Sequence, residues 1–340
     1  MTSQQKDNLF VLVKSLSKSE KRQFKLYVGR LGGNTDSKFL ALFNLLDKLN
    51  KYNEKSILKS DIVKKAQLSN LKAHLYKQIL ISLRLNPLHQ NTRAQIREQL
   101  DFATILYHKG LYKQSLKLLD KAKNTAINNE EKILAYEIVE LEKVIESQYI
   151  TRSISNRADE LTEQAKTLSI QNTITSKLSN LSLQLYGVLL KTGYAKNDDE
   201  YQQITTYFNN RMPEFKLSEL GFREKLWLYK SHLWYNFLVQ DFLTCYKYAT
   251  KWVDLFHKNE PMISLNPVFF LKGYNYLLES LYHVKYHSKY KKALSEFEYF
   301  IDTSTLLPQD DNVKALRFLY LYSHKLNLHF FEGTFKEGLP

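Results

Sequence analysis

Histidine and cysteine are the residues of this chain whose types and spacing could bind a metal ion or catalyse a reaction. His283 and His287 stand four residues apart, and one helix would place both imidazoles on the same face at the spacing of zinc ligands. The sequence has no His-Glu-x-x-His stretch and no cysteine pair, and no third ligand accompanies the two histidines. We therefore expect no metal site and no cofactor.

The single cysteine, Cys245, is the one candidate for a thiol nucleophile. It follows Phe242 by three positions in a predicted helix, where a small side chain packs against the neighbouring helix. No His or Asn pattern marks it as catalytic, and a buried cysteine ordinarily behaves as a small hydrophobic residue. The sequence also lacks a Gly-x-Ser-x-Gly elbow, a phosphate-binding loop and a dinucleotide fingerprint. We therefore expect a protein that catalyses no reaction.

Clusters of acidic and hydroxyl residues mark helix starts rather than acid-base pairs. Ser17 and Glu20 have the spacing of a capping box, in which each side chain accepts from the other residue's amide. The carboxylates in 198–200 and 310–311 stand where a helix dipole favours negative charge. These clusters predict three helix N-termini.

Composition favours an all-α protein. Of 340 residues, 44% are hydrophobic, and only ten are Gly and six are Pro, so long stretches carry no helix breaker. No apolar stretch approaches the roughly 20 residues that cross a bilayer, and the polar start at residues 1–5 lacks a secretory signal. We therefore expect a cytoplasmic protein without membrane insertion.

A turn with a common pattern recurs along the chain. An aromatic residue is followed three positions later by a small residue, with aromatic anchors at Tyr112, Phe242, Tyr290 and Phe335. The last two steps are 48 and 45 residues, and weaker turn signals near 150–153 and 192–199 divide the long first gap. Such a period indicates stacked supersecondary modules. The pattern predicts five complete helix pairs and the beginning of a sixth.

The segment Ala103–Ala122 resembles a tetratricopeptide repeat. Its matching positions are Gly110, Tyr112, Ser115, Leu119 and Ala122, and the later matches are Phe242, Cys245 and Trp252, then Tyr290, Ala293 and Phe297, then Gly333, Phe335 and Gly338. The resemblance implies a right-handed solenoid of paired antiparallel helices, although the steps exceed the family's usual 34 residues. The segment from Leu16 to Phe24, followed by the helical array, also resembles uncharacterised bacterial helical-repeat proteins.

The tetratricopeptide resemblance further implies a scaffold or adaptor that binds a protein or peptide on a concave surface lined by the first helix of each pair. The alternative is that the aromatic residues of these helices only pack against one another. Carried over by position, the lining residues would be Arg97, Thr104, Tyr107, Trp227, Lys230, Trp234, Asn275, Tyr282, Lys285, Tyr320 and Asn327.

The N-terminal part is basic and forms a separate predicted domain, 1–87, before the repeat array, 88–340. Residues 1–90 hold 17 Lys or Arg against six Asp or Glu, which accounts for most of the net charge of +14. The stretch 57–83 can be divided into a helix, a turn at 66–69 and a second helix, as in a helix-turn-helix DNA-binding module. The alternatives are a helical cap on the array and a merely solvated basic surface. For nucleic acid, the candidate contacts are Lys21, Arg22, Lys25, Lys64, Lys65, Lys72 and Lys77.

The last residues repeat the start of a second helix. Phe335, Gly338 and Leu339 match the opening of one, yet the sequence stops at Pro340. The predicted helix 313–331 would then lack the helix that covers it, whereas a solenoid normally ends in a polar capping helix. We therefore expect that the natural chain continues beyond this point.

Overall fold

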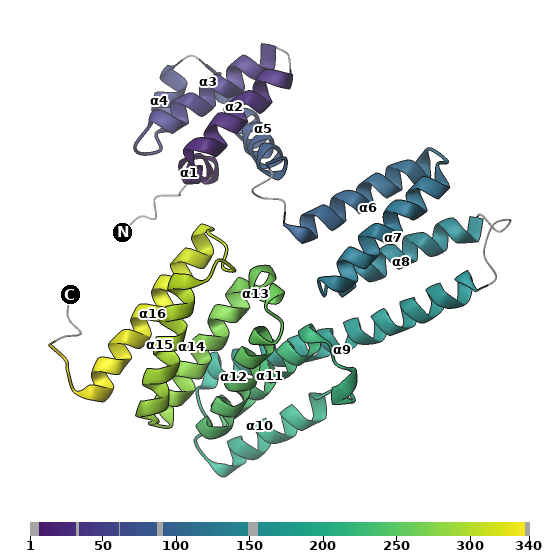
Figure 1. Cartoon of the computed structure of the whole chain (residues 1–340). Helices are drawn as coiled ribbons and strands as arrows, with labels where there is room; N and C mark the ends of the chain where they lie inside the picture. The colour runs from purple at the N-terminus through teal and green to yellow at the C-terminus, as the bar shows by residue number, and fades with distance from the viewer. Residues whose placement is uncertain (1–6, 32–33, 61, 87–90, 149–155, 337–340) are drawn as a thin grey trace. The chain divides into compact units, whose positions relative to one another are not determined.

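All secondary structure described in the computed structural model is helical (Figure 1). The structure describes residues 7–31, 34–60, 62–86, 91–148 and 156–336. The chain divides into two compact units, an N-terminal unit, Met1–Gln95, and a C-terminal unit, Ile96–Pro340. None of the described helices is both long and apolar enough to cross a membrane. The prediction of an all-α fold is confirmed.

Five helices build the N-terminal unit around one apolar core. Large side chains of four of these helices, among them Phe24, Phe43, Ile57 and Leu75, are almost completely buried there. The Ser17 amide donates to Glu20 Oε2 (2.7 Å) and the Glu20 amide donates to Ser17 Oγ (3.2 Å), so the predicted capping box is confirmed. The helices are α1 (Asn8–Ser15), α2 (Lys18–Leu31), α3 (Asn34–Lys48), α4 (Glu54–Lys59) and α5 (Lys65–Arg84).

The predicted turn at 66–69 is wrong, because these residues form the first turns of α5. The turn lies earlier, between the end of α4 at Lys59 and the start of α5 at Lys65. Ala66 and Gln67 are good helix formers, and the helical conformation buries Leu68 in the core, so residues 66–68 favour a helix over a turn. The first helix of the supposed helix-turn-helix is only six residues long.

Ten of the eleven α-helices of the C-terminal unit form or continue a series of antiparallel pairs; the eleventh, α13, is a five-residue connector. The pairs are α6/α7, α8/α9, α9/α10, α11/α12 and α14/α15, followed by α16. The bounds are α6 (Thr92–His108), α7 (Tyr112–Asn128), α8 (Lys132–Gln148), α9 (Arg157–Thr192), α10 (Asp198–Arg211), α11 (Phe222–Leu238), α12 (Phe242–His257), α13 (Pro261–Leu265), α14 (Pro267–His283), α15 (His287–Thr303) and α16 (Asp311–Glu332). A short 3-10 helix, Leu217–Glu219, precedes α11.

The 36-residue helix α9 belongs to two successive pairs (Figure 1). Its N-terminal part runs antiparallel to α8, since Arg157 contacts Glu142 while Asn172 donates to the Lys132 carbonyl oxygen. Its C-terminal half is covered by α10, where the Tyr207 hydroxyl donates to a side-chain oxygen on α9 (2.8 Å). The helix α9 therefore serves both as the second helix of the pair with α8 and as the first helix of the pair with α10.

The first helices of successive pairs run parallel and contact one another. The Ser231 hydroxyl on α11 donates to the Leu178 carbonyl oxygen on α9 (3.0 Å), and Trp227 on α11 meets Phe269 on α14 edge to face (5.5 Å between ring centroids). His324 on α16 then hydrogen-bonds the Asn275 amide oxygen on α14 (3.1 Å). We call the surface formed by the C-terminal half of α9 with α11, α14 and α16 the first-helix face.

Five helices end in the same left-handed turn. The first or second residue after each helix has positive φ, and the amide of the residue that follows it donates five positions back, as in a Schellman motif. These residues are Gly110 (φ 74°), Glu130 (58°), Gln240 (60°), Lys285 (56°) and Gly333 (68°). Tyr290 follows Lys285 by five positions, as Ser115 follows Gly110 and Cys245 follows Gln240. Tyr290 is therefore equivalent to these small packing residues and not to the anchors Tyr112 and Phe242, so its predicted place in the repeat is wrong by three residues.

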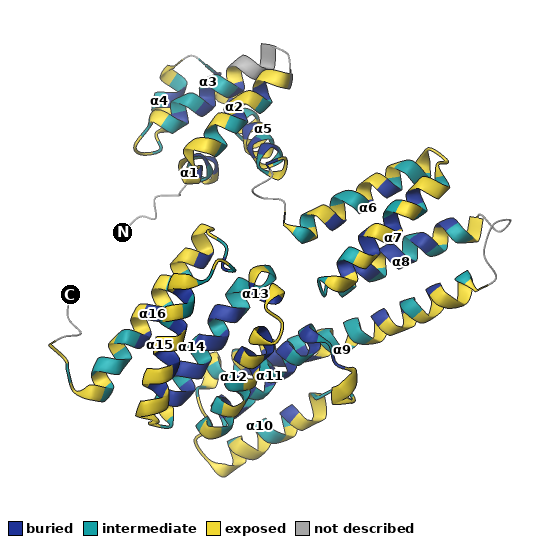
Figure 2. Ribbon diagram, in the orientation of Figure 1, coloured by how far each residue is buried: buried dark blue, intermediate teal, exposed yellow. Residues whose placement is uncertain are grey.

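The core of the C-terminal unit depends on one close approach between α12 and α14. The Trp252 indole lies fully buried against Gly273 and donates to the Phe269 carbonyl oxygen (3.0 Å). A Cβ atom at Gly273 would lie 2.9 Å from Trp252 Cδ1, so only glycine fits there. Figure 2 shows the buried stripes along α11, α12 and α14.

Helix α16 is apolar on both sides. One side packs on α14 and α15, while the other exposes apolar residues at four-residue spacing, among them Phe318, Tyr322, Leu326 and Phe330. Leu233 on α11 and Leu326 on α16 are equivalent, because each lies seven residues before the positive-φ residue of its turn, Gln240 or Gly333. Leu233 is completely buried, whereas Leu326 is 46% exposed.

Candidate functional site

The two histidines with zinc-ligand spacing do not share a helix. His283 ends α14 and stacks on Phe242 (4.2 Å between ring centroids), while His287 begins α15 after the left-handed turn. The predicted single helix through both residues is wrong, because Lys285 turns the chain. Within the described ranges, no group of three or more His, Cys, Asp or Glu side chains could hold a metal ion.

Cys245 is a packing residue of α12. Its side chain is completely buried, and its Sγ lies 3.7 Å from the Leu233 carbonyl oxygen on α11. Burial raises the pKa of the thiol far above its ordinary value. Ser115 makes the equivalent contact on α7, donating to the Ala103 carbonyl oxygen (2.7 Å). Both residues hold a second helix against the first helix of its pair.

Aromatic side chains form a row across the first-helix face. Tyr186 on α9 lies beside Trp234 on α11 (4.7 Å between ring centroids), and Trp234 meets Tyr276 on α14 edge to face (5.2 Å). Tyr320 on α16 lies close enough to Tyr276 to raise the pKa of its phenol, although burial is the larger cause. The buried Trp234 indole N–H has no acceptor among the described residues. The row therefore joins four parallel helices.

Two lysines lie beside this row without a counter-charge. Lys230 Nζ lies over the rings of Trp227 (4.6 Å to the centroid) and Phe269 (5.5 Å). Burial, and secondarily the charge of Lys272, lowers the pKa of Lys230 to about 8. Within the described part of the chain, neither lysine forms an ion pair. This is a partly desolvated cationic patch, which favours a negatively charged group of a ligand.

Glu279 places a single carboxylate on the other side of the row. It lies on α14 one turn after Tyr276 and is half-buried. Burial raises the pKa of this carboxyl, and no described cation forms an ion pair with it. The first-helix face thus carries unpaired charges of both signs on an aromatic surface.

The structure brings four of the predicted groove residues to this surface, namely Trp227, Lys230, Trp234 and Tyr320. Asn275 binds His324, and Asn327 lies against the Tyr290 hydroxyl, so both hold α16 in place. Tyr282 packs on Phe331, and Lys285 lies in the turn after α14.

The three predicted groove residues of α6 lie outside the four-helix row. Arg97 is exposed, the Thr104 hydroxyl donates to a carbonyl oxygen of its own helix, and the Tyr107 hydroxyl donates to Gln148 on α8 (3.1 Å).

Sequence reasoning missed Tyr186, Lys272, Tyr276 and Glu279 as members of this surface. Tyr186 was hidden because α9 has no turn where a new pair begins. For α14, the signal was available: polar or aromatic residues recur at 272, 276 and 279 among buried leucines. The periodicity of one helix gives the side of the helix but not which other helix covers it.

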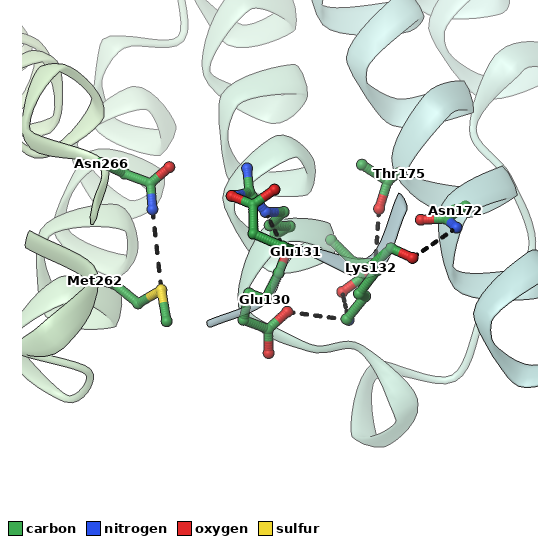
Figure 3. Close-up of polar contacts among 9 residues, drawn as sticks. Glu130, Glu131, Lys132, Asn172, Thr175, Met262 and Asn266 are labelled. Atoms are coloured by element: carbon green, nitrogen blue, oxygen red, sulfur yellow. Dashed lines mark hydrogen bonds and ion pairs between the residues drawn. The ribbon is translucent and has the colours of Figure 1, made fainter. Parts of the chain in front are cut away.

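Polar contacts fix the start of α11 to the start of α8 and the middle of α9 (Figure 3). Lys132 Nζ lies 2.8 Å from Glu224 Oε2, and the Thr175 hydroxyl donates to Glu224 Oε1 (3.0 Å). Arg223 pairs with Glu131 (2.6 Å). Glu224 is completely buried, so these contacts neutralise a charge inside the protein.

The candidate basic residues of the N-terminal unit differ in whether they are exposed or held by other side chains. Lys18, Lys21, Arg22 and Lys25 line an open hollow of about 480 Å³ on α2. Of these, Lys21 pairs with Asp47 (2.8 Å), whereas Arg22 and Lys25 are exposed. The other candidates lie around α5: Lys64, Lys65 and Lys77 are exposed, and Lys72 is held by Asp7 and Tyr52.

Comparisons with protein families, curated proteins and solved structures find no match to this chain. The geometry of the first-helix face is therefore the basis for the function proposed below.

Proposed function

We propose that the chain is a non-catalytic adaptor or scaffold that binds a protein or peptide on its first-helix face. The observation that carries this proposal is the aromatic row from Tyr186 to Tyr320, with two unpaired lysines on one side of it and an unpaired carboxylate on the other. Aromatic residues are enriched among those that anchor protein partners, and unpaired charges beside them provide specificity. The proposal includes a right-handed, tetratricopeptide-like stacking of the helix pairs and a location in the cytoplasm.

The experiment reverses the cationic patch and follows binding of an identified partner. Lys230→Glu with Lys272→Glu should abolish capture of the partner and its direct binding in calorimetry, while circular dichroism shows unchanged helicity. The matched control is Lys247→Glu with Lys258→Glu, which reverses two exposed charges, one on α12 and one directly after its end. Equal loss in both double variants would mean that net charge, and not the first-helix face, determines binding.

A nucleic-acid-binding regulator is the second candidate, because four basic side chains of α2 line one hollow. Phosphate contacts release counterions, so the affinity should fall steeply with salt. Arg22→Ala with Lys25→Ala in the full chain should weaken retardation of duplex DNA or RNA and reduce its salt dependence. If the intact protein retards neither nucleic acid at low ionic strength, this candidate is wrong.

A further inference from the structure

Glu279 has no cationic partner among the described residues, although the chain carries a net charge of +14. Its carboxylate forms no ion pair and accepts no side-chain hydrogen bond from any described residue. It is also partly removed from water, and burial of an ionised carboxylate without a partner is costly. Packing alone does not explain a half-buried carboxylate without a cationic partner in a strongly basic chain.

Aromatic and apolar groups surround this carboxylate. The charge of Glu279 contributes, after burial as the larger cause, to the raised pKa of the Tyr276 and Tyr194 phenols and of the Cys245 thiol, so these three groups lie near its carboxylate. Tyr194 itself lies against Phe242, ring edge to ring face (6.2 Å between centroids). Tyr276 lies on α14 one turn before Glu279, whereas Tyr194 lies in the loop after α9 and is 39% exposed. Glu279 itself is only half-buried, so a ligand can reach its carboxylate from solvent.

A carboxylate beside aromatic rings is suited to an organic cation. The ring faces attract a cation through their quadrupole, and the carboxylate contributes a charge-assisted hydrogen bond to a guanidinium or ammonium group. The small, strongly hydrated inorganic cations need several oxygen ligands, which this site lacks. The chemistry fits the side chain of lysine or arginine.

The spacing to the cationic patch adds a second constraint. Lys272 and Glu279 lie seven residues apart on α14, which is two helical turns or about 10 Å. Seven residues in the helix of a partner cover the same distance, and an extended segment covers it in three residues. A bound segment could therefore place an acidic side chain at Lys230 and Lys272 and a basic one at Glu279.

We propose that Glu279, with Tyr194 and Tyr276, forms the subsite for a lysine or arginine side chain of the bound segment. This inference rests on the proposed function, because it assigns one part of the same face. It adds that the partner is recognised by a basic residue about 10 Å from an acidic one, with an apolar or aromatic residue between them.

The test is selection of displayed random 12-residue peptides against the full-length protein and two variants. The wild type should enrich peptides with one basic and one acidic residue. Glu279→Gln should lose only the enrichment of the basic residue, and Lys230→Glu with Lys272→Glu only that of the acidic residue. If the wild type enriches no peptide, the proposed function fails. If it enriches peptides whose basic content is the same in the Glu279→Gln selection, only the present inference fails.

Calorimetry with a single enriched peptide then measures how much Glu279 contributes to the binding affinity. Glu279→Gln should weaken its binding in calorimetry by about tenfold or more, since a charge-assisted contact is lost. Replacing the peptide's basic residue by norleucine should weaken binding to the wild type equally, with little further effect in Glu279→Gln. The control Glu296→Gln, an exposed glutamate on α15, should leave the affinity unchanged. Additive losses from the two changes would overturn the assignment.

Discussion

Lys132 Nζ lies 2.8 Å from Glu224 Oε2, although the two residues are 92 positions apart in the sequence. The contact joins the start of α8 to the start of α11 where both meet the middle of α9. Glu224 is completely buried, and Lys132 also approaches Glu130 (3.1 Å). The pair therefore holds the first two helix pairs of the C-terminal unit to the rest of it.

Breaking this pair from one side should cost more than removing it. Lys132→Met leaves the Glu224 carboxylate buried with only Thr175, and we expect a loss of about 3 kcal/mol in the free energy of unfolding. Lys132→Met with Glu224→Leu should be less destabilised than Lys132→Met alone. Urea unfolding of the two single variants and the double variant measures the coupling. Additive single effects would show that the two charges do not interact.

The charge of Lys230 should make stability depend on pH in the alkaline range. Its pKa is about 8 in the folded protein, below its ordinary value of 10.5, so the unfolded chain binds the proton more tightly. Between these two values the unfolded state holds more protons, and stability contributed by this residue rises with pH. In Lys230→Met this contribution is absent, which a comparison of melting temperatures at pH 7.5 and about pH 9.5 measures. The control Lys247→Met should follow the wild type.

Glu279 should act on stability in the opposite direction. Its pKa is raised by burial, so the folded state binds the proton more tightly than the unfolded chain does. The ionised carboxylate therefore lowers stability as the pH rises above the ordinary carboxyl value. We expect Glu279→Gln to melt at a higher temperature than the wild type at pH 7, and this difference to shrink towards about pH 4. A variant that melts lower at pH 7 would indicate a structural role for the carboxylate.

The features predicted from the sequence were those that depend on neighbours in the chain. The capping box of Ser17 and Glu20 is confirmed, as is the helix start at Asp310, whose side chain accepts from the Val313 amide (2.9 Å). Both depend on hydrogen bonds over three residues, which residue types alone specify. The turn at Gly110 was found because glycine adopts its positive φ without strain.

The features that were missed depend on packing between distant segments. Glu130 and Lys285 adopt the left-handed conformation without glycine, so a search for Gly and aromatic residues missed the turn at Glu130 and misplaced the anchor of the turn at Lys285. The continuity of α9 through two helix pairs is stabilised by contacts with α8, α10 and α11, and no local signal requires it. The face around Glu279 likewise appears only when four helices are placed side by side.

The turn at Lys285 offers a test that separates backbone conformation from binding. Lys285 is exposed, has φ 56° and makes no ion pair among the described residues, so its Cβ is strained without a compensating contact. Lys285→Gly should therefore stabilise the protein by up to about 1 kcal/mol. The converse change, Gly110→Ala at φ 74°, should destabilise it by a similar amount, because a Cβ there meets no other atom and only the backbone conformation is penalised. Urea unfolding measures both changes. Because Lys285 lies in the turn and not on the first-helix face, Lys285→Gly should also bind the selected peptides with unchanged affinity. Lys272→Gly on α14 should instead weaken the binding of these peptides. A loss of affinity in Lys285→Gly would extend the binding surface to the turn.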